Sequence, residues 1–252
     1  MPSDHSLLFI AGLGRSGTTA LLEVLAAHSD VALGVERYKR LYPRDDEPVT
    51  ADLFEEQRFF DFSDRLTNLT PEQAPEWAAH YGAMRAKWSS ARYVGDKMVA
   101  IRLQHLWETL PDARFVCIVR DLAPVAASWE ARATNPDDLG WSADQDATKA
   151  VAAWNRSLRR VRRAVKQRPD RAVVVEYDRF FGDPRGEALG KVLGWLGLDR
   201  SSEIDTAFAH VHATYVEKVA PKQRTLSPET LAFLDEHAER EVWDQVTAEL
   251  AL

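Results

Sequence analysis

The sequence has little of what anchors or cross-links several classes of protein. Its 252 residues contain one cysteine, Cys117, which excludes a disulfide framework and a zinc site made of several thiolates. Apolar stretches are short, and none reaches the roughly 18 to 20 residues that a membrane-spanning helix needs. Residues 7–11 follow no basic leader, so we expect no secretory signal and a cytoplasmic protein.

An excess of basic residues is also missing. The formal net charge is −7, so the chain is no dedicated nucleic-acid binder and any anion site must be built locally. The seven histidines show no spacing typical of metal ligands; His28 and His105 are interpreted as structural, and no metal site is expected. With 45% hydrophobic residues, eight Trp and no repeat or linker, the chain is predicted to form one domain over residues 1–252.

Short buried apolar runs alternate with helical patterns along the chain. This alternation predicts an α/β fold, a central parallel sheet flanked by helices on both faces in three layers. The expected strands cover residues 7–11, 31–33, 93–97, 113–119 and 172–175, and the expected helices cover 18–28, 101–110, 187–196 and segments starting at 147 and 227. Cys117 lies within one of these strands and is expected to be buried.

Residues 52–92 are rich in charge and aromatics. We expect them to form a helical insertion or lid over the carboxyl edge of the sheet, with Trp and Phe side chains at the acceptor pocket. Within them, Thr70-Pro71-Glu72-Gln73 has the form of a capped helix start. The last helix is expected to start at Ser227-Pro228 and to present Leu231, Leu234, Val242 and Val246 on one side.

A glycine-rich loop, Gly12-Leu13-Gly14-Arg15-Ser16-Gly17-Thr18-Thr19, lies between the first strand and the first helix. Glycines let backbone N–H groups converge on an anion, and the start of the helix adds partial positive charge. Arg15 brings a permanent charge with a planar set of donors. The loop is P-loop-like but lacks the Lys of a Walker A motif, which disfavours ATP hydrolysis. A plain strand-to-helix turn is the alternative.

At these residues the sequence resembles the sulfotransferases that use 3′-phosphoadenosine 5′-phosphosulfate (PAPS), in their bacterial and carbohydrate branch. The 5′-phosphosulfate loop of that branch has the form Gly-x-x-Arg-Ser-Gly-Thr-Thr, which residues 12–19 match. The resemblance implies PAPS as donor, 3′-phosphoadenosine 5′-phosphate (PAP) as product, no metal, and donor contacts from Gly14, Arg15, Ser16, Gly17, Thr18 and Thr19.

Further motifs of this family follow in order, so that the resemblance spans nearly the whole chain. It is weakest over residues 44–90 and after residue 200. Two motifs depart from the usual pattern, because Val99 and Leu122 stand where the family usually has Pro. The matching segments are Asp96-Lys97, Val119-Arg120-Asp121-Leu122 with Ser128, Glu176-Tyr177-Asp178, Asp183-Pro184 and Leu196-Gly197-Leu198.

Arg120 follows a buried strand, at the sheet edge where α/β folds bind ligands, and Ser128 lies about two helical turns further on. An Arg and a hydroxyl so placed can share one phosphate, and the resemblance makes it the 3′-phosphate. The alternatives are an ion pair of Arg120 with Asp121 or another carboxylate, and a buried helix serine at position 128. The resemblance also implies donor contacts from Tyr177 and from a basic loop with Lys218, Lys222 and Arg224.

The family needs a base to deprotonate the acceptor. Lys97-Met98-Val99 lacks the His that the cytosolic members place there, whereas Glu36, after the second strand, resembles the Glu that the glycan and bacterial branch uses. Lys97 and Arg15 are expected to offset charge on the transferred group. The alternatives are that Glu36 pairs with Arg37 or Lys39, and that Lys97 is a surface or ion-pair lysine.

The sequence therefore predicts a PAPS-dependent sulfotransferase that moves a sulfuryl group to a hydroxyl or amine of a glycan or small-molecule acceptor. Two alternatives are a P-loop nucleotide or small-molecule kinase and a non-catalytic glycan-binding relative. Neither a nucleic-acid partner nor a membrane span is expected. The acceptor, the residue that contacts adenine, the role of the basic run 156–168 and the oligomeric state stay open.

Overall fold

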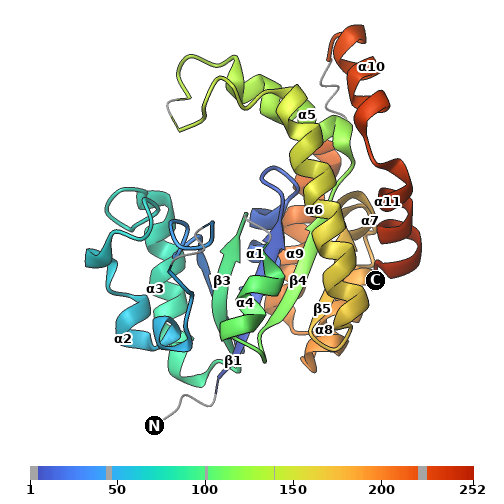
Figure 1. Ribbon diagram of the computed structural model, residues 1–252. Helices are drawn as coiled ribbons and strands as arrows, with labels where there is room; N and C mark the ends of the chain where they lie inside the picture. Colours follow the sequence, from blue (N-terminus) through green and yellow to red (C-terminus); the bar gives the residue numbers. More distant parts are fainter. Residues whose placement is uncertain (1–4, 44–46, 100–101, 139, 221–225) are drawn as a thin grey trace.

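The protein is described by a computed structural model of residues 5–43, 47–99, 102–138, 140–220 and 226–252. Across this part of the chain, five parallel strands form one sheet in the order β2-β3-β1-β4-β5 (Figure 1). The strands are β1 Ser6–Gly12, β2 Val31–Val35, β3 Tyr93–Met98, β4 Arg114–Val119 and β5 Ala172–Glu176. The parallel sheet confirms the predicted fold class.

Helices cover both faces of this sheet (Figure 1). The α-helices of the described residues are α1 Thr18–Leu25, α2 Glu56–Phe59, α3 Ala78–Lys87, α4 Leu103–Thr109, α5 Leu122–Ala133, α6 Ala147–Gln167, α7 Tyr177–Gly182, α8 Glu187–Leu196, α9 Ser202–Thr214, α10 Pro228–His237 and α11 Arg240–Asp244. No helix in the described ranges combines the length and the apolar character needed to cross a bilayer.

Two cores lie on opposite sides of the sheet because neighbouring residues of a strand point to opposite faces. Phe9 and Ala11 of β1 join the core under α4, α5, α6 and α10, whereas Leu8 and Ile10 join the core under α1, α7, α8 and α9. Cys117 is fully buried in the first core, as expected, and burial raises the pKa of its thiol to about 12. The sheet thus forms the middle layer of a three-layer α/β/α arrangement.

The segment between β2 and β3 packs along β2, which is an edge strand. The His80 ring of α3 lies 2.7 Å from the Leu33 carbonyl of β2, and burial lowers the pKa of this histidine. A side chain that occupies an edge carbonyl protects the edge from pairing with other chains. That residues 52–92 act as a lid stays a prediction.

The predicted helix start at Thr70 is wrong. The Thr70 hydroxyl does accept the Gln73 amide at 3.1 Å, but the chain makes a single turn and α3 begins only at Ala78. The reason is Pro75, which has no amide proton and disfavours helical backbone at Ala74, where φ is −135° and ψ 76°.

Some aromatic side chains expected at the pocket belong to the core instead. Phe54, Phe59 and Trp88 are each 2% exposed or less, and the Phe59 and Trp88 rings pack with centroids 4.9 Å apart. Buried against each other, these rings are unavailable to stack on an acceptor.

The last helix is broken where a continuous one was expected. α10 ends at His237 because Ala238 takes extended backbone, and α11 begins at Arg240. Asn155 of α6 compensates for the lost helical bonds, since its side-chain amide donates to the His237 carbonyl at 2.8 Å and accepts the Glu239 amide at 3.0 Å. A polar residue on another element therefore stabilises the break.

Candidate active site

The predicted site residues follow strand ends at one edge of the sheet. Val35 of β2 is paired with Lys97 of β3, Gly12 of β1 with Ile118 of β4, and Val119 of β4 with Glu176 of β5. Because the strands are parallel and in this register, the segments that follow them begin at the same edge. The glycine-rich loop 12–19, Glu36, Arg120 and Tyr177 follow strand ends at this edge, and Lys97 is the second-last residue of β3.

Two glycines of the glycine-rich loop 12–19, Gly12 and Gly17, have no space for a larger residue. Gly17 has φ 100°, and a Cβ at this position would lie 2.2 Å from the Tyr177 ring. A Cβ on Gly12 would lie 2.7 Å from the Ser16 hydroxyl and 2.9 Å from the Ile118 carbonyl. By contrast, a Cβ on Gly14 would meet nothing within 4 Å, so the loop is open at that residue.

Ser16 holds the loop together from the inside. Its hydroxyl lies 2.7 Å from the Leu13 carbonyl and 3.3 Å from the Ile118 carbonyl, and the residue is 2% exposed. The exposed positions of the loop are Arg15 and Thr19, while Thr18 is buried at the start of α1. Arg15 has φ 77°, a conformation uncommon for a residue with a side chain.

Helix α5 contacts this loop through two consecutive residues. Arg15 Nε donates to the Ser128 hydroxyl at 3.0 Å, and the Trp129 indole N–H donates to the Gly14 carbonyl at 3.1 Å. Sequence reasoning assigned Arg15 and Ser128 to two different phosphates, and the structure brings the two side chains together. The sequence did not predict a role for Trp129, because no pattern near this residue indicates a hydrogen bond to a loop 115 residues earlier.

Arg120 lies with its guanidinium over the Tyr177 ring, 4.0 Å from the centroid. Its Nε is buried and has no hydrogen-bond partner among the described residues. The alternative partner Asp121 is engaged elsewhere, since it accepts the Ala123 amide at 2.9 Å and pairs with Arg240 at 2.8 Å. A buried guanidinium nitrogen without a partner is a donor that an anion can satisfy.

Glu36 and Lys97 form an ion pair, with Nζ 2.7 Å from Oε1. Lys97 is 3% exposed and Glu36 13%, so the pair is largely shielded from water. Lys39 is a second and more distant partner at 3.9 Å, whereas Arg37 points away into a buried bond with Asp64. Glu36 has φ 49°, a strained conformation that clusters at functional sites.

Comparison with known proteins decides the family. The sulfotransferase family matches residues 8–202 of this chain. The chain belongs to the sulfotransferase family. A putative protein-tyrosine sulfotransferase of Caenorhabditis briggsae is 24% identical over 209 residues, which are 79% of this chain and 68% of the relative.

Solved sulfotransferases share the fold. The sulfotransferase domain from the Synechococcus PCC 7002 olefin synthase superposes with a TM-score of 0.54 at 18% identity, over 94% of this chain and 97% of that one. The domain from the curacin biosynthetic pathway gives 0.53 at 14% identity, over 92% and 97%. A mouse sulfotransferase in complex with PAP gives 0.50 at 12% identity, over 96% and 83%.

Asp96 is a buried carboxyl group to which sequence reasoning assigned no role beyond its place in the Asp96-Lys97 motif. Asp96 is fully buried in β3, where its Oδ2 accepts the Tyr42 hydroxyl at 2.5 Å and the Tyr38 amide at 3.3 Å. Burial raises the pKa of Asp96 to about 7, although the bonds from Tyr42 and Tyr38 lower it. The signal in the sequence was an Asp inside a buried strand pattern, which is costly unless paired.

We expect the stability of this sulfotransferase to depend on pH through Asp96. Asp96 of the folded protein has a pKa of about 7, whereas in the unfolded chain its pKa returns to the ordinary value of 3.8, so unfolding releases a proton between these pH values. The free energy of unfolding therefore falls as pH rises through this window and levels off above it. Asp96→Asn removes this pH dependence. Denaturant titrations should therefore show that the free energy of unfolding of the variant, relative to wild type, increases by up to about 4 kcal/mol between pH 4 and 7. A difference that stays constant over this range would contradict the assignment.

Trp129→Phe is expected to weaken PAP binding. The variant keeps the ring packing against Trp141 but loses the bond that fixes the Gly14 carbonyl and, through the shared peptide plane, the direction of the Arg15 amide. A hydrogen bond of this kind contributes about 0.5–1.5 kcal/mol, so calorimetry should show a roughly two- to tenfold higher Kd. Trp107→Phe is the matched control, because its indole donates to the Ala113 carbonyl at 2.9 Å on another element. Equal Kd values for the two variants would remove Trp129 from the site.

The predicted basic loop is described only in part. Lys218 is exposed in the turn Tyr215–Val219 that continues α9, while Lys222 and Arg224 lie outside the described residues. Their contact with the donor stays a prediction.

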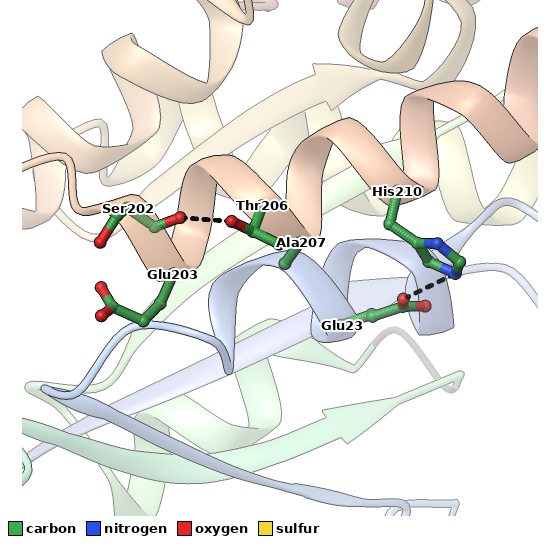
Figure 2. A pocket seen from close by; sticks show the side chains of 6 residues that line it. All are labelled: Glu23, Ser202, Glu203, Thr206, Ala207 and His210. Carbon is green, nitrogen blue, oxygen red and sulfur yellow. Dashed lines mark hydrogen bonds and ion pairs between the residues drawn. The ribbon is translucent and has the colours of Figure 1, made fainter.

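Two surface hollows lie apart from the carboxyl-edge residues. One lies on α6 and is lined by Arg156, Arg159, Arg160 and Arg163, four members of the basic run. The other, about 590 Å³, lies between α1 and α9, where the His210 ring faces the Glu23 carboxylate (Figure 2). His210 Nε2 lies 3.8 Å from Glu23 Oε1. Neither hollow shares a residue with the site described above.

Proposed function

We propose that this sulfotransferase transfers the sulfuryl group of PAPS to a hydroxyl or amine of a glycan or small-molecule acceptor. The observation that carries the proposal is the shared edge: Arg15 follows β1, which pairs with β3 of Lys97, and Arg120 and Ser128 come after β4 on the other side of β1. Side chains that can stabilise negative charge, and a carboxylate that can accept a proton, thus lie at the same carboxyl edge of the sheet.

The chain's residues fit such a donor. The loop backbone is open at Gly14, where a Cβ would meet nothing within 4 Å, and Arg120 Nε, which has no partner among the described residues, offers a donor that a phosphate can satisfy. We assign the 5′-phosphosulfate to the loop 14–19 with Arg15, and the 3′-phosphate to Arg120 and Ser128. When bound, PAPS supplies a sulfuryl group on a good leaving group, and ATP, which has no 3′-phosphate, leaves the Arg120 site unfilled.

Glu36 is assigned the role of general base. Its carboxylate takes the proton of the acceptor hydroxyl or amine, which makes that atom a better nucleophile toward sulfur. Lys97 and Arg15 offset negative charge on the transferred oxygens. Lys97 can do so only if its ammonium group leaves the Glu36 carboxylate. The positive charge that is paired with Glu36 in this structure then moves to the transferred sulfuryl group.

The acceptor class is left broad in this proposal. The Caenorhabditis briggsae relative is named for protein tyrosine, so a tyrosine peptide belongs in any acceptor panel beside sugars, phenols and amines. A single buried thiol, which allows no disulfide within the chain, fits the cytoplasmic location that we propose.

Ligand-dependent thermal stability tests the nucleotide assignment. PAP is expected to raise the Tm of wild type further as its concentration increases, because a ligand that binds the folded state stabilises it. ADP with magnesium is expected to leave the Tm unchanged, since it cannot fill the Arg120 site. Selective stabilisation by ADP and magnesium would overturn the proposal in favour of a kinase.

A further inference from the structure

The turn that carries Glu36 is fixed by bonds on both sides of that residue. On one side, the Glu36 amide donates to the Lys97 carbonyl at 2.8 Å. On the other, Arg37 is fully buried and its guanidinium donates to the Phe59 and Asp61 carbonyls, each at 2.6 Å, and to Asp64 at 2.7 Å. A backbone at positive φ persists only when its surroundings determine it this fully.

Asp96 supplies the next constraint along this turn. One oxygen, Oδ2, holds both the backbone amide of Tyr38, two residues after Glu36, and the hydroxyl of Tyr42. Asp96 lies beside Lys97 in β3, so two successive residues of this strand hold residues 36 and 38 of the turn. Tyr42 is itself 4% exposed, which places the whole arrangement inside the protein.

Stability alone does not favour a carboxyl group here. The other oxygen, Oδ1, is buried and has no hydrogen-bond partner in the part of the chain that the structure describes, and a Cβ built on Gly34 would lie 3.1 Å from it. Leaving a buried acceptor unpaired costs free energy, whereas an apolar side chain of similar shape avoids that cost. An Asp at this position is therefore explained by what it holds rather than by packing.

We propose that Asp96 is a positioning residue for Glu36, which it keeps aligned for proton transfer by holding the Tyr38 amide and the Tyr42 hydroxyl together. The inference rests on the proposed function, in which Glu36 is the base. Because small displacements of a catalytic group can lower turnover up to about 100-fold, losing this constraint should lower kcat rather than weaken donor binding.

Four variants separate positioning from general damage. Asp96→Ala removes the acceptor, and Asp96→Asn restores an oxygen for the Tyr38 and Tyr42 donors. Tyr42→Phe removes one donor with little change in volume. Tyr93→Phe is the matched control, since it deletes another buried hydroxyl, bonded to the Leu196 carbonyl at 2.6 Å, at the opposite end of the same strand.

Turnover, the KM for PAPS, the Kd for PAP and the Tm are measured for each variant. We expect Asp96→Ala to lower kcat by roughly 10- to 100-fold with the Kd for PAP within twofold of wild type, and Asp96→Asn to recover most of the loss. Tyr42→Phe should lose several-fold more kcat than Tyr93→Phe at a similar Tm. If Asp96→Ala does not fold, the comparison of Tyr42→Phe with Tyr93→Phe decides.

Three results would overturn the inference: wild-type kcat in Asp96→Ala, equal losses in Asp96→Ala and Asp96→Asn, or equal kcat in the two tyrosine variants. A wild type that releases no PAP with any acceptor would instead contradict the proposed function. In that case crystal structures of Asp96→Ala, or of Tyr42→Phe in its place, still test the inference. It fails if Glu36 of the variant keeps its positive φ and its contact with Lys97.

Discussion

Glu36→Gln should lower kcat by about 10² to 10⁴ while the Kd for PAP stays near that of wild type. The amide keeps the shape of the side chain but cannot take a proton from the acceptor. Because the lost interaction belongs to the transition state, the KM for PAPS should not rise to match the fall in kcat. Steady-state kinetics with a saturating acceptor measures both quantities.

The control for this variant is His105→Gln. His105 lies on α4, where its ring is 3.2 Å from Glu108, and we expect its replacement to affect activity only through stability. Near-normal turnover in Glu36→Gln, together with an inactive but folded His105→Gln, would show that the base is wrongly assigned.

Arg120→Ala should raise the Kd for PAP roughly 10- to 100-fold and leave the fold intact. A charge-assisted bond to phosphate contributes about 1.5–3 kcal/mol, and the unpartnered Nε shows that this donor has no competing acceptor among the described residues. Calorimetry with PAP measures the loss, and circular dichroism checks the fold.

Arg114→Ala is the matched control for this change. Arg114 is the first residue of β4, whereas Arg120 follows the last residue of the same strand. The Arg114 guanidinium lies 5.2 Å from the Trp195 ring centroid, much as that of Arg120 lies over Tyr177. Arg114→Ala should therefore keep wild-type affinity for PAP. Unchanged affinity in Arg120→Ala would remove Arg120 from the 3′-phosphate site.

The parts of this protein that the sequence alone predicted are those with local causes. Strand β4 is an apolar run from Phe115 to Val119, and α6 carries a stripe of buried apolar side chains at helical spacing. The glycine loop is likewise contained in eight consecutive residues. Each of these signals lies within the element that it specifies.

The features that escaped prediction depend on residues far apart in the chain. Pairing of Glu36 with Lys97 requires β2 and β3 to be neighbours, and the order of strands is not a local property. The break after His237 depends on Asn155, and the Gly14 carbonyl is held by Trp129. Burial of Phe59 and Trp88 follows from packing between distant segments, which aromatic content does not reveal.

Release of PAP from PAPS in the presence of acceptors tests the central claim most directly. Wild type is incubated with PAPS and a panel of sugars, phenols, amines and a tyrosine peptide, with and without a metal chelator, and PAP and sulfated product are measured together. We expect wild type to release one PAP for each sulfated acceptor, at a rate that the chelator leaves unchanged and that is at least 100-fold lower in Glu36→Gln. It is contradicted if folded wild-type protein releases no PAP with any acceptor.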